Sequence, residues 1–593
     1  MLDDVGSYEF DIPAFWKPGT QPELAVSNTP HIKELTESGT LFTRYYTYAV
    51  CSPARAAAMT GLHAADPRNG VYSNGKHPGD TENFLFQYYG KTVPLTSLTN
   101  TTGRLLRKLN YTTAHINKIH GFNRTHFRSS DLFDRIIELP GTDYQYYDTT
   151  NYTGELADKY YAPYTEAEVD YIAAHQDRYN QTELRNILVG TPKHKTDAYE
   201  ALMEDVVTEM REDSPNKPFY VQWHMRAPHM PAIPRTDLIP FYESGGKNQV
   251  LALLETADQA IGRFISFLDR EGLRNDTLIL LTADNGSKRE QPRDVAKGRK
   301  GGSYQNAVNV PLVVSLPGVI PAGQSKTHPV HVTDLLPTWL EIAGMPKSEV
   351  DQMKLGGRSF ASVLECDVSV CPVRYRNIYS HLPQLQRNGP FSSIVGTTGR
   401  WKLSYRYLYD IFELYDLKKD PAETENLLVE RGDKALARCV QLRDWLNETT
   451  SQDTDYIIDR ATNLTVPFPS SCTNMRSFAD LQLLDSVSLE QEPNDDVTVS
   501  WTLTELESPV NTNDEYTIEA IEVPAYGLLD VKMREAPLGG NWSVWESLYS
   551  QLPYTGSVTV TGLEFNITYQ FKVRLRMMEE KMKWVKSSTF LLS

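Results

Sequence analysis

The sequence is poor in cysteine: its 593 residues include only Cys51, Cys366, Cys371, Cys439 and Cys472. No two of them are spaced as Cys-x-x-Cys, and no zinc-binding spacing occurs, which excludes the common cysteine-based zinc motifs. If Cys51 has a separate role, four cysteines remain, and four allow three disulfide pairings. Proximity along the chain favours Cys366 with Cys371 and Cys439 with Cys472.

Long hydrophobic runs are also absent. The sequence contains no apolar stretch of about 18 residues, so it predicts no transmembrane span, and no internal repeat stands out. Basic residues are outnumbered, with 59 Lys and Arg against 76 Asp and Glu and a net charge of −17. This balance argues against nucleic acid or an anionic membrane as a partner. An anionic substrate would have to be attracted by a local positive cluster.

The chain is longer than one typical domain, and much of it alternates strand and helix patterns. Apolar, β-branched runs at 112–116, 219–223 and 278–281 predict strands, and helical patterns occupy 196–211 and 250–273. Such alternation predicts an α/β fold with a mostly parallel central sheet and helices on both faces. Ligands bind to such sheets beyond the carboxyl ends of the strands.

The segment Cys51-Ser-Pro-Ala-Arg55 is the most informative in the sequence. It follows a run rich in strand formers at 41–50, Pro53 suits the first turn of a helix, and Gly61 suits its C-cap. Cys51 is therefore expected at a helix N-terminus, where unpaired backbone N–H groups favour an anion. Taken alone, such a cysteine would more often be a buried structural residue.

Five further segments carry polar residues at expected strand ends or in turns. Each is unremarkable alone, since paired carboxylates, proline-flanked histidines and Asp-Asn-Gly turns are common on surfaces. Their order and spacing are specific when taken together. The segments are Asp3-Asp4-Val-Gly6, Lys118-Ile-His120, Arg226-Ala-Pro-His229-Met-Pro231, Thr282-Ala-Asp284-Asn285-Gly286 and Lys300-Gly-Gly-Ser-Tyr304.

Together with Cys-x-Pro-x-Arg, these segments resemble the type I, formylglycine-dependent sulfatases. The resemblance runs from residue 3 to about residue 430, where residues 413–427 look like the family's C-terminal subdomain motif. It implies an alkaline-phosphatase-like sulfatase fold and arylsulfatase-like hydrolysis of sulfate esters. In that family the matching cysteine is oxidised to formylglycine, whose hydrated aldehyde is the nucleophile. A formylglycine-generating enzyme would then be a partner of Cys51 during maturation.

The resemblance also implies a role for each matched residue. Arg55 and Lys118 would hold the formylglycine hydroxyls, and His120 would take a proton when sulfate is expelled. His229 and Lys300 would face the leaving-group oxygen, and one of them would protonate it. One divalent cation, most plausibly Ca²⁺ with Mg²⁺ as the alternative, would be bound by Asp3, Asp4, Asp284 and Asn285 together with residue 51.

The match is incomplete at residues 305–309, where Gln305, Asn306, Ala307 and Asn309 replace the usual Glu, Gly, Gly and Arg. This departure affects the expected loop shape and substrate preference more than it affects the role assigned to Lys300. Lys297 is a competing candidate for the same position. It ranks second because it breaks the four-residue spacing to Tyr304.

The C-terminal part of the chain has a different pattern. We expect a sulfatase domain at 1–463, with a smaller α+β subdomain beginning near 370, then a polar linker at 464–490. Short, evenly spaced strands predict an all-β sandwich at 491–593. Trp501 in an early strand and Tyr569 as a corner tyrosine resemble a fibronectin type III module; another small β domain is the alternative. No catalytic set occurs there, so this domain is expected to be a spacer or to bind a protein or glycan.

Asn-x-Ser/Thr sequons are frequent and predict a glycoprotein of the secretory pathway, extracellular or lysosomal. The even number of cysteines beside Cys51 agrees with that oxidising compartment. A further sequon at Asn285 is discounted because this residue is assigned to the cation. The others begin at Asn100, Asn110, Asn123, Asn151, Asn180, Asn275, Asn447, Asn463, Asn541 and Asn566.

The start of the sequence conflicts with this interpretation. Asp3 and Asp4 should follow a central apolar strand, but only Met1 and Leu2 precede them, and no signal peptide is present. Either a preceding segment is missing from the sequence, which we favour, or the protein lacks one core strand. A protein without that strand is expected to fold poorly or to have low activity.

Three hypotheses for the function follow. The first is a formylglycine-dependent sulfatase whose substrate is a sulfate ester, plausibly of a carbohydrate. The second is a phosphate-ester hydrolase of the same superfamily, which would need a Ser or Thr nucleophile and a second Asp/His cluster that the sequence lacks. The third is a non-catalytic adhesion or interaction protein, suggested by the predicted sandwich and by the altered residues 305–309.

Overall fold

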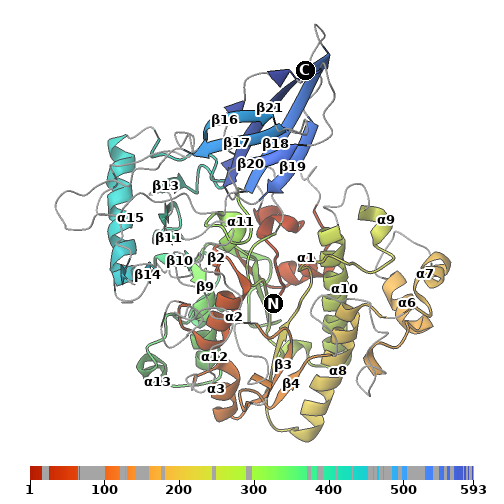
Figure 1. The fold of residues 1–593 in the computed structure, drawn as a ribbon. Helices are drawn as coiled ribbons and strands as arrows, with labels where there is room; N and C mark the ends of the chain where they lie inside the picture. Colours follow the sequence, from red (N-terminus) through yellow and green to blue (C-terminus); the bar gives the residue numbers. More distant parts are fainter. Residues whose placement is uncertain are drawn as a thin grey trace.

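A computed structural model gives the fold of the chain (Figure 1). It describes residues 1–15, 26–64, 66, 100–120, 127–128, 130–139, 159–174, 181–191, 193–242, 249–288, 297–369, 371, 376–382, 391–407, 411–429 and 432–451, together with Cys472 and short strands between 458 and 591. Residues 516–523 of the predicted sandwich and the sequons at Asn123, Asn151, Asn180, Asn463, Asn541 and Asn566 lie outside the described residues.

Two sheets form the centre of the N-terminal part. One is parallel, in the order β4 (Arg135–Ile137), β3 (Thr112–Asn117) and β5 (Phe219–His224). The other has the order β6 (Ile279–Thr282), β7 (Leu312–Ser315), β1 (Thr40–Phe42) and β8 (Gln324–Lys326). In this second sheet β7 runs antiparallel to both neighbours, whereas β1 and β8 are parallel.

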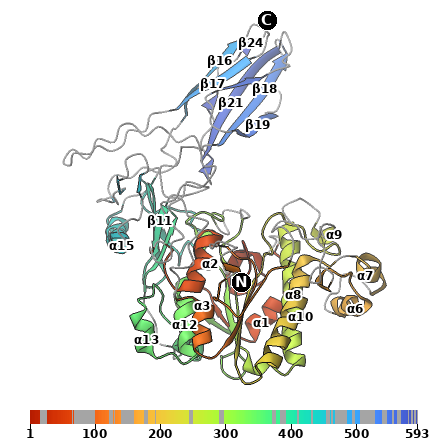
Figure 2. The same ribbon diagram turned by 60° about the horizontal axis from the view of Figure 1, so that its bottom comes forward.

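The N-terminal residues join the two sheets. Leu2 forms a parallel bridge with Ala283, and its N–H donates to the carbonyl of Thr282 over 2.7 Å. On the other side, the N–H of Met225 donates to the carbonyl of Met1 over 2.9 Å. Met1 and Leu2 therefore lie between β5 and β6, at the position where a central strand was expected, and Figure 2 shows the N-terminus in the middle of the fold.

Helices cover both sides of this assembly (Figures 1 and 2). On one side α8 (Lys195–Asp213) and α10 (Gln249–Arg270) contact each other, and α1 (Pro30–Glu37) packs against α10. On the other side α2 (Cys51–Thr60), α3 (Thr102–Lys108) and α12 (Leu335–Ile342) contact one another. The prediction of an α/β fold with parallel strands is confirmed.

The predicted elements agree closely with the observed ones. The strands expected at 112–116, 219–223 and 278–281 correspond to β3, β5 and β6, and the helices expected at 196–211 and 250–273 to α8 and α10. The strand-forming run at 41–50 is divided between β1 and β2 (Tyr45–Tyr46), and β2 pairs with β9 (Val330–His331). The remaining helices of this part are α6 (Glu166–Ala174), α7 (Gln181–Leu188), α9 (Ile239–Tyr242), α11 (Gln305–Val308), α13 (Lys347–Gln352) and α14 (Ala361–Leu364).

A smaller α+β unit follows beyond residue 370. Its antiparallel sheet consists of β10 (Ile378–Leu382), β11 (Phe391–Val395), β12 (Trp401–Arg406) and β13 (Ile411–Asp416). Helix α15 (Asp433–Ser451) contacts β11 and β12, and its buried Leu442 and Leu446 join the same apolar core as Leu403. Both favoured disulfides are present, Cys366–Cys371 and Cys439–Cys472, and Cys51 is a free, buried cysteine.

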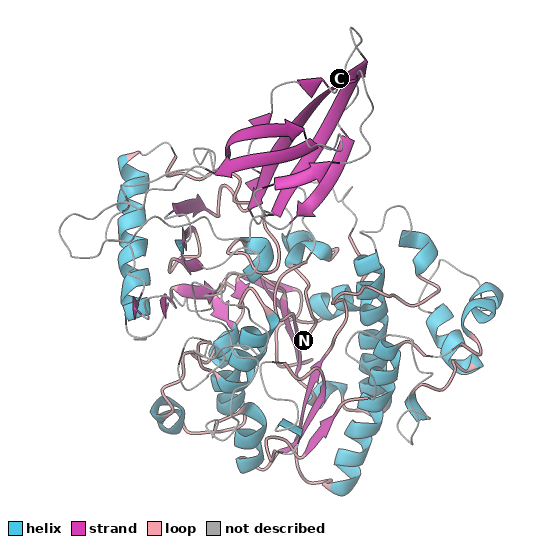
Figure 3. Ribbon diagram, in the orientation of Figure 1, coloured by secondary structure: helices cyan, strands magenta, loops and turns pink. Residues whose placement is uncertain are grey.

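Beyond α15 the described residues, apart from Cys472, are in strands (Figure 3). After a short pair, β14 (Ile458–Asp459) and β15 (Leu464–Thr465), they form two antiparallel sheets. One is ordered β16 (Leu484–Gln491), β17 (Val497–Leu503) and β20 (Ser557–Val560). The other contains β18 (Leu528–Pro537), β19 (Glu546–Leu552) and β21 (Ile567–Met577), with β22 (Glu580–Lys581), β23 (Val585–Lys586) and β24 (Phe590–Leu591) paired to β21.

The strand β16 lies largely within the stretch for which the sequence predicted a linker. Its apolar residues Leu484, Val487 and Leu489 do not alternate regularly, and they give only a weak strand signal beside the polar residues that follow.

Within the described residues, no helix is long and apolar enough to cross a membrane.

The longer of the two disulfide loops is expected to contribute more to stability. Cys439 and Cys472 are separated by 33 residues and Cys366 and Cys371 by five. By loop-closure entropy, replacing Cys439 and Cys472 with alanine should lower the free energy of unfolding by about 4 kcal/mol, against about 2 kcal/mol for the matched Cys366/Cys371 double variant. Urea unfolding followed by circular dichroism measures both values. Equal losses would contradict the expectation.

A second stability prediction concerns the central strand that was expected before Asp3. The strands β5 and β6 are the facing edges of their sheets, and residues 219–222 and 279–280 are only half-buried. An extension of about five alternating apolar residues fused before Met1 should pair with these edges and support the adjacent aspartates. We expect the melting temperature to rise by about 4 °C or more, and Ca²⁺ binding to strengthen in calorimetry. A Gly/Ser extension of equal length is the control, and equal Ca²⁺ binding by the two proteins would refute the prediction.

Candidate active site

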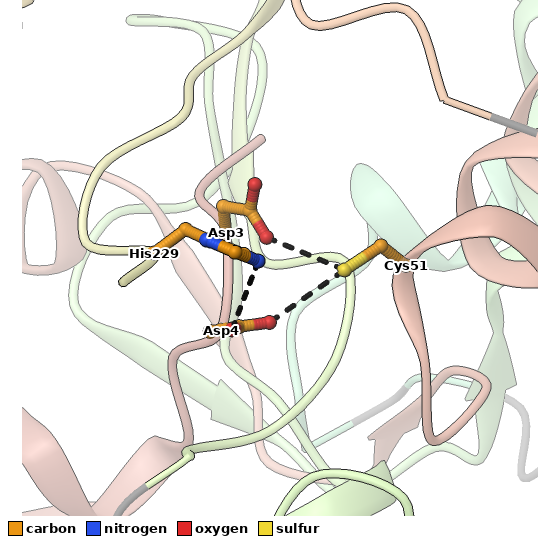
Figure 4. Close-up of side chains that lie close together, drawn as sticks. All are labelled: Asp3, Asp4, Cys51 and His229. Atoms are coloured by element: carbon orange, nitrogen blue, oxygen red, sulfur yellow. Dashed lines mark hydrogen bonds and ion pairs between the residues drawn. The ribbon is translucent and has the colours of Figure 1, made fainter. Parts of the chain in front are cut away.

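Cys51 is the first residue of α2, as the sequence predicted. All ten residues of this helix are buried, and three consecutive alanines allow it to pack closely. The helix ends at Gly61, whose φ of 64° is the left-handed conformation that favours glycine, and the N–H of Gly61 bonds to the carbonyl of Ala57. The helix is thus held at both ends, and Figure 4 shows Cys51 directed toward the N-terminal aspartates.

Asp3 and Asp4 lie opposite Cys51 (Figure 4). The Cys51 Sγ is 3.5 Å from Asp3 Oδ1 and 3.6 Å from Asp4 Oδ1, and both carboxylates are buried. Asp4 has a φ of 65°, a conformation that few residues other than Gly, Asn and Asp adopt. This sharp turn after Leu2 brings two successive carboxylates into the same space.

Asp284 and Asn285 follow β6 and lie beside the two aspartates. The bridge between Leu2 and Ala283 brings the end of β6 to this place. Asp284 Oδ1 accepts the N–H of Asp4 over 3.1 Å, and Asn285 Nδ2 donates to Asp4 Oδ1 over 2.9 Å. The four residues therefore form one connected and buried set.

Arg55 joins α2 to these carboxylates one turn after Cys51. Its Nε donates to Asp284 Oδ2 over 2.8 Å, and its Nη2 is 3.5 Å from Asp3 Oδ2. The side chain is 0% exposed, and a guanidinium can be buried only with such partners because desolvating an unpaired charge is costly. Arg55 therefore holds the helix, Asp3 and Asp284 in one arrangement.

Lys118 and His120 follow the end of β3. Asn117, immediately before Lys118, has a φ of 78°, which turns the chain at this point. Lys118 Nζ forms a buried ion pair with Asp3. Burial, with the positive charge of Lys118, lowers the pKa of His120 well below its usual value, so this imidazole is neutral and able to accept a proton.

His229 and Lys300 complete the site from two loops. His229 Nε2 lies 3.6 Å from Asp4 Oδ2, and its side chain is 16% exposed. Lys300 Nζ donates to Cys51 Sγ over 2.8 Å and pairs with Asp4. The competing Lys297 lies elsewhere, with its Nζ 4.4 Å from the ring centroid of Tyr304, so the geometry favours Lys300.

Charge pairing controls the titration of the carboxylates. Burial alone would raise the pKa of Asp3, but Lys118 and Arg55 outweigh it and hold that pKa well below its usual value. Lys300 similarly lowers the pKa of Asp4 against the effect of burial. Both aspartates are therefore ionised at neutral pH and act as acceptors.

The other groups respond mainly to burial. Burial lowers the pKa of His229 to about 4, although Asp3 and Asp4 oppose the shift. Burial and the neighbouring Asp284 raise the pKa of the Cys51 thiol. An unmodified Cys51 is therefore a protonated thiol rather than a reactive thiolate.

The cluster has the ligand atoms that a divalent cation requires. Asp3, Asp4, Cys51 and His229 offer atoms that all lie within 4.8 Å of one another. Buried acceptors normally receive a hydrogen bond, yet Asp4 Oδ2 and Asn285 Oδ1 receive none from the described residues. Carboxylate and amide oxygens suit Ca²⁺ or Mg²⁺, so these residues fit such an ion.

Glu9 and Ser287 belong to the site but were missed by sequence reasoning. Glu9 accepts the Ser287 hydroxyl over 2.6 Å and the Gly6 N–H over 3.0 Å. The carbonyl of Ser287 in turn accepts the N–H of Lys300 over 2.6 Å. Glu9 therefore ties the aspartate turn to the loop of Lys300. Since the Glu9 and Ser287 contact spans 278 residues, no local pattern could have shown it.

The structure thus brings all the predicted site residues to one place. Direct contacts connect nine of them, and His120 interacts electrostatically with Lys118 and Asp3. The nine are Asp3, Asp4, Cys51, Arg55, Lys118, His229, Asp284, Asn285 and Lys300.

Comparison with known proteins agrees with this geometry. The family model described as Sulfatase matches residues 19–345, and a second model, described as N-sulphoglucosamine sulphohydrolase, C-terminal, matches residues 300–452. A protein of Formosa agariphila named Sulfatase is 29% identical over 516 residues, which cover 75% of this chain and 87% of that protein. The dog N-acetylgalactosamine-6-sulfatase is 23% identical over 363 residues, covering 58% and 61%.

Solved structures show the same fold. The crystal structure of Ps i-CgsB has a TM-score of 0.56 and 20% identity, covering 77% of this chain and 92% of that one. The structure of BT4656 in complex with its substrate D-glucosamine-2-N,6-O-disulfate has a TM-score of 0.52 and 19% identity, covering 77% and 98%. With a family model that spans more than half of its residues, the chain belongs to the sulfatase family and is a sulfuric ester hydrolase.

Proposed function

We propose that the protein hydrolyses sulfate monoesters with formylglycine, formed from Cys51, as its nucleophile. The observation that carries this proposal is the position of Cys51 Sγ, buried at a helix N-terminus, within 3.6 Å of Asp3 and Asp4 and 2.8 Å from Lys300 Nζ. A hydrated aldehyde at residue 51 would present its hydroxyls to these charged groups. An oxidised side chain fits this polar setting better than a buried thiol does.

A divalent cation, Ca²⁺ or Mg²⁺, is part of the proposal. Asp3, Asp4, Asp284 and Asn285 would hold it together with residue 51, and the two buried acceptors without hydrogen bonds support this assignment. When bound, such an ion supplies Lewis-acid polarisation of a sulfate oxygen and makes a hydroxyl more acidic.

The remaining residues supply positive charge and proton transfer. A sulfate monoester is an anion, and its hydrolysis builds further charge on the leaving oxygen, so cationic partners stabilise the transition state. Arg55 and Lys118 would orient the hydroxyls of residue 51, and neutral His120 would accept a proton as sulfate leaves. His229 and Lys300 would face the leaving-group oxygen, which one of them protonates.

We further propose a sulfated carbohydrate as the substrate class. The dog relative is named an N-acetylgalactosamine-6-sulfatase, and BT4656 was solved with a disulfated glucosamine as its substrate. The partly exposed His229 gives a bulky leaving group access to the site.

Maturation would require a formylglycine-generating enzyme, and we propose that it takes place in the secretory pathway. Two disulfides support an oxidising compartment, and the sequons at Asn110, Asn275 and Asn447 are exposed. We also retain a domain at residues 1–463 and a separate fibronectin type III-like module that binds a protein or glycan, predicted at 491–593 and here taken to include β16 from Leu484. The two antiparallel C-terminal sheets support a separate β module.

Mass spectrometry of the peptide that contains Cys51 tests the proposed nucleophile. Protein co-expressed with a formylglycine-generating enzyme should show the mass loss that accompanies conversion of the thiol to the aldehyde, and it should hydrolyse 4-nitrophenyl sulfate faster than 4-nitrophenyl phosphate. Unmodified thiol in a preparation with full sulfatase activity would contradict the proposal, as would a preference for the phosphate ester.

A further inference from the structure

Residues 413–427 have no part in the proposed chemistry, yet they contact the loop 297–305, which carries Lys300. Two acidic residues make this contact: Glu413 in β13, which is 2% exposed, and Glu423 beyond the end of β13, which is 0% exposed. Each accepts a hydrogen bond from the loop. Carboxylates that are buried without partners are costly, so these contacts fix both the two acidic side chains and the loop.

Glu413 holds the loop through Tyr304. The Tyr304 hydroxyl donates to Glu413 Oε1 over 2.7 Å, and Tyr304 is 1% exposed. Lys297 Nζ and Arg406 Cζ lie 4.4 Å and 4.8 Å from the ring centroid of Tyr304. Burial alone would raise the pKa of Glu413, but Arg406 and Lys297 outweigh it and lower that pKa to about 2. Glu413 is therefore ionised at neutral pH and is a strong acceptor for the hydroxyl.

Glu423 holds the next residue of the loop by its backbone. Its Oε2 accepts the N–H of Gln305, and its Oε1 accepts Lys402 Nζ over 2.6 Å in an ion pair whose two side chains are 0% exposed. Beside Glu423, the carbonyl of Ala422 accepts the N–H of Lys297 over 3.1 Å. The loop is therefore fixed at both of its ends.

Between these two ends the loop contacts Cys51 and the segment before it. Lys300 Nζ donates to Cys51 Sγ over 2.8 Å, and the N–H of Gly301 donates to the carbonyl of Ala49 over 2.8 Å. A shift of the loop would move Lys300 relative to residue 51. A misplacement of about 1 Å at a reacting centre can cost about 100-fold in rate, so the anchoring of the loop matters for the chemistry.

We propose that Glu413 and Glu423 are positioning residues of the active site, which act through the loop 297–305 to hold Lys300 at the leaving-group oxygen. This inference rests on the proposed function and extends it, because it makes the smaller α+β unit a support of the active site. An ammonium group stabilises the charge on a leaving oxygen only where it is held in place beforehand. A displaced Lys300 therefore slows the hydrolysis of esters with poor leaving groups more than that of esters with good ones.

Tyr304→Phe tests the contact with Glu413 and keeps the buried ring. The substrates are 4-nitrophenyl sulfate, which has a good leaving group, and phenyl sulfate, which has a poorer one. We expect kcat for phenyl sulfate to fall by about ten-fold, the value of one hydrogen bond to a charged group, and kcat for 4-nitrophenyl sulfate by no more than about three-fold. KM should change little for either ester. A merely structural defect would lower both rates by the same factor.

Tyr415→Phe is the matched control. Tyr415 is also 1% exposed, and its hydroxyl donates to the same Oε1 of Glu413 over 2.8 Å, but it lies in β13 and not in the loop. Its replacement should keep the wild-type ratio of the two rates. The proposal is overturned if Tyr304→Phe lowers both rates equally, or if Tyr415→Phe changes their ratio as much as Tyr304→Phe does.

Two double variants test Glu423. Lys402→Met/Glu423→Met and Lys402→Met/Glu423→Gln both remove the buried ion pair, but only glutamine keeps an oxygen that can accept the N–H of Gln305. The methionine variant should lower kcat for phenyl sulfate as Tyr304→Phe does, and the glutamine variant should restore most of it. Equal rates in the two double variants would show that Glu423 does not position the loop.

Hydrogen exchange reads the position of the loop without any substrate. By mass spectrometry, the peptide that contains the loop should exchange about five-fold faster in Tyr304→Phe and in the methionine double variant, the value of one lost hydrogen bond. It should exchange at the wild-type rate in Tyr415→Phe. Unchanged exchange in both loop variants overturns the proposal. If exchange changes as expected but the wild-type enzyme hydrolyses neither ester, the hold on the loop is supported and the proposed function is contradicted.

Discussion

Cys51→Ala is expected to lower sulfate ester turnover by at least about 10⁴-fold, the scale on which the loss of a nucleophile acts in enzymes that form covalent intermediates. Alanine cannot be oxidised to formylglycine, so no nucleophile remains between Asp3, Asp4 and Lys300. The fold should persist, because alanine is a good helix former and the change removes one sulfur atom from a helix that is buried along its whole length. Hydrolysis of 4-nitrophenyl sulfate and the melting temperature measure the two effects.

Ser52→Ala is the matched control for this variant. Ser52 is the next residue of α2, it is 1% exposed, and its hydroxyl makes no hydrogen bond with the described residues. Since x in Cys-x-Pro-x-Arg is not specified, this change should leave modification and turnover within about three-fold of the unaltered enzyme. Retained turnover in Cys51→Ala would remove Cys51 from the mechanism, and equal losses in both variants would indicate a structural effect of the helix.

The sequence predicted the residues that depend on local chain geometry. Cys51 and Gly61 mark the two ends of α2 because a helix start and a left-handed C-cap each have a local chemical cause. Lys118 and Asp284 follow β3 and β6, and the carboxyl ends of parallel strands converge at one edge of a sheet. Patterns of a few residues were therefore sufficient to place most of the candidate site.

The features of the site that the sequence did not predict depend on contacts between residues far apart in the chain. Glu9 reaches Ser287 across 278 residues. The altered residues 305–309 give another example. Asn309 Nδ2 donates to the carbonyls of Thr43 and Tyr45, so this side chain holds the loop before α2, a role that its position in the motif did not suggest.

Met1 and Leu2 have a structural role that no local pattern predicted. They satisfy backbone groups of Trp223, Met225, Thr282 and Asp284, and in this way they position the two carboxylates that follow.

Asp4→Asn is expected to have the second-largest effect, because Asp4 contacts residues from four different segments of the site. It approaches Cys51, pairs with Lys300, accepts from Asn285 and faces His229. Replacing its carboxylate with an amide removes one negative charge from the proposed cation site and leaves Lys300 without its ion-pair partner. Affinity for Ca²⁺ should fall by about 100-fold or more, and turnover by at least about 10³-fold.

Calorimetric titration of the metal-stripped proteins with Ca²⁺ and Mg²⁺ measures this effect, and the melting temperature with and without each ion gives an independent estimate through linkage. Asp258→Asn is the control. Asp258 is also buried, but it accepts hydrogen bonds from the N–H groups of His31 and Ile32 at the start of α1 and is not part of the cluster that could hold a cation. Its replacement should therefore leave cation binding unchanged. If Asp4→Asn binds Ca²⁺ as tightly as Asp258→Asn does, Asp4 is not a ligand, and the cation must be held by other residues.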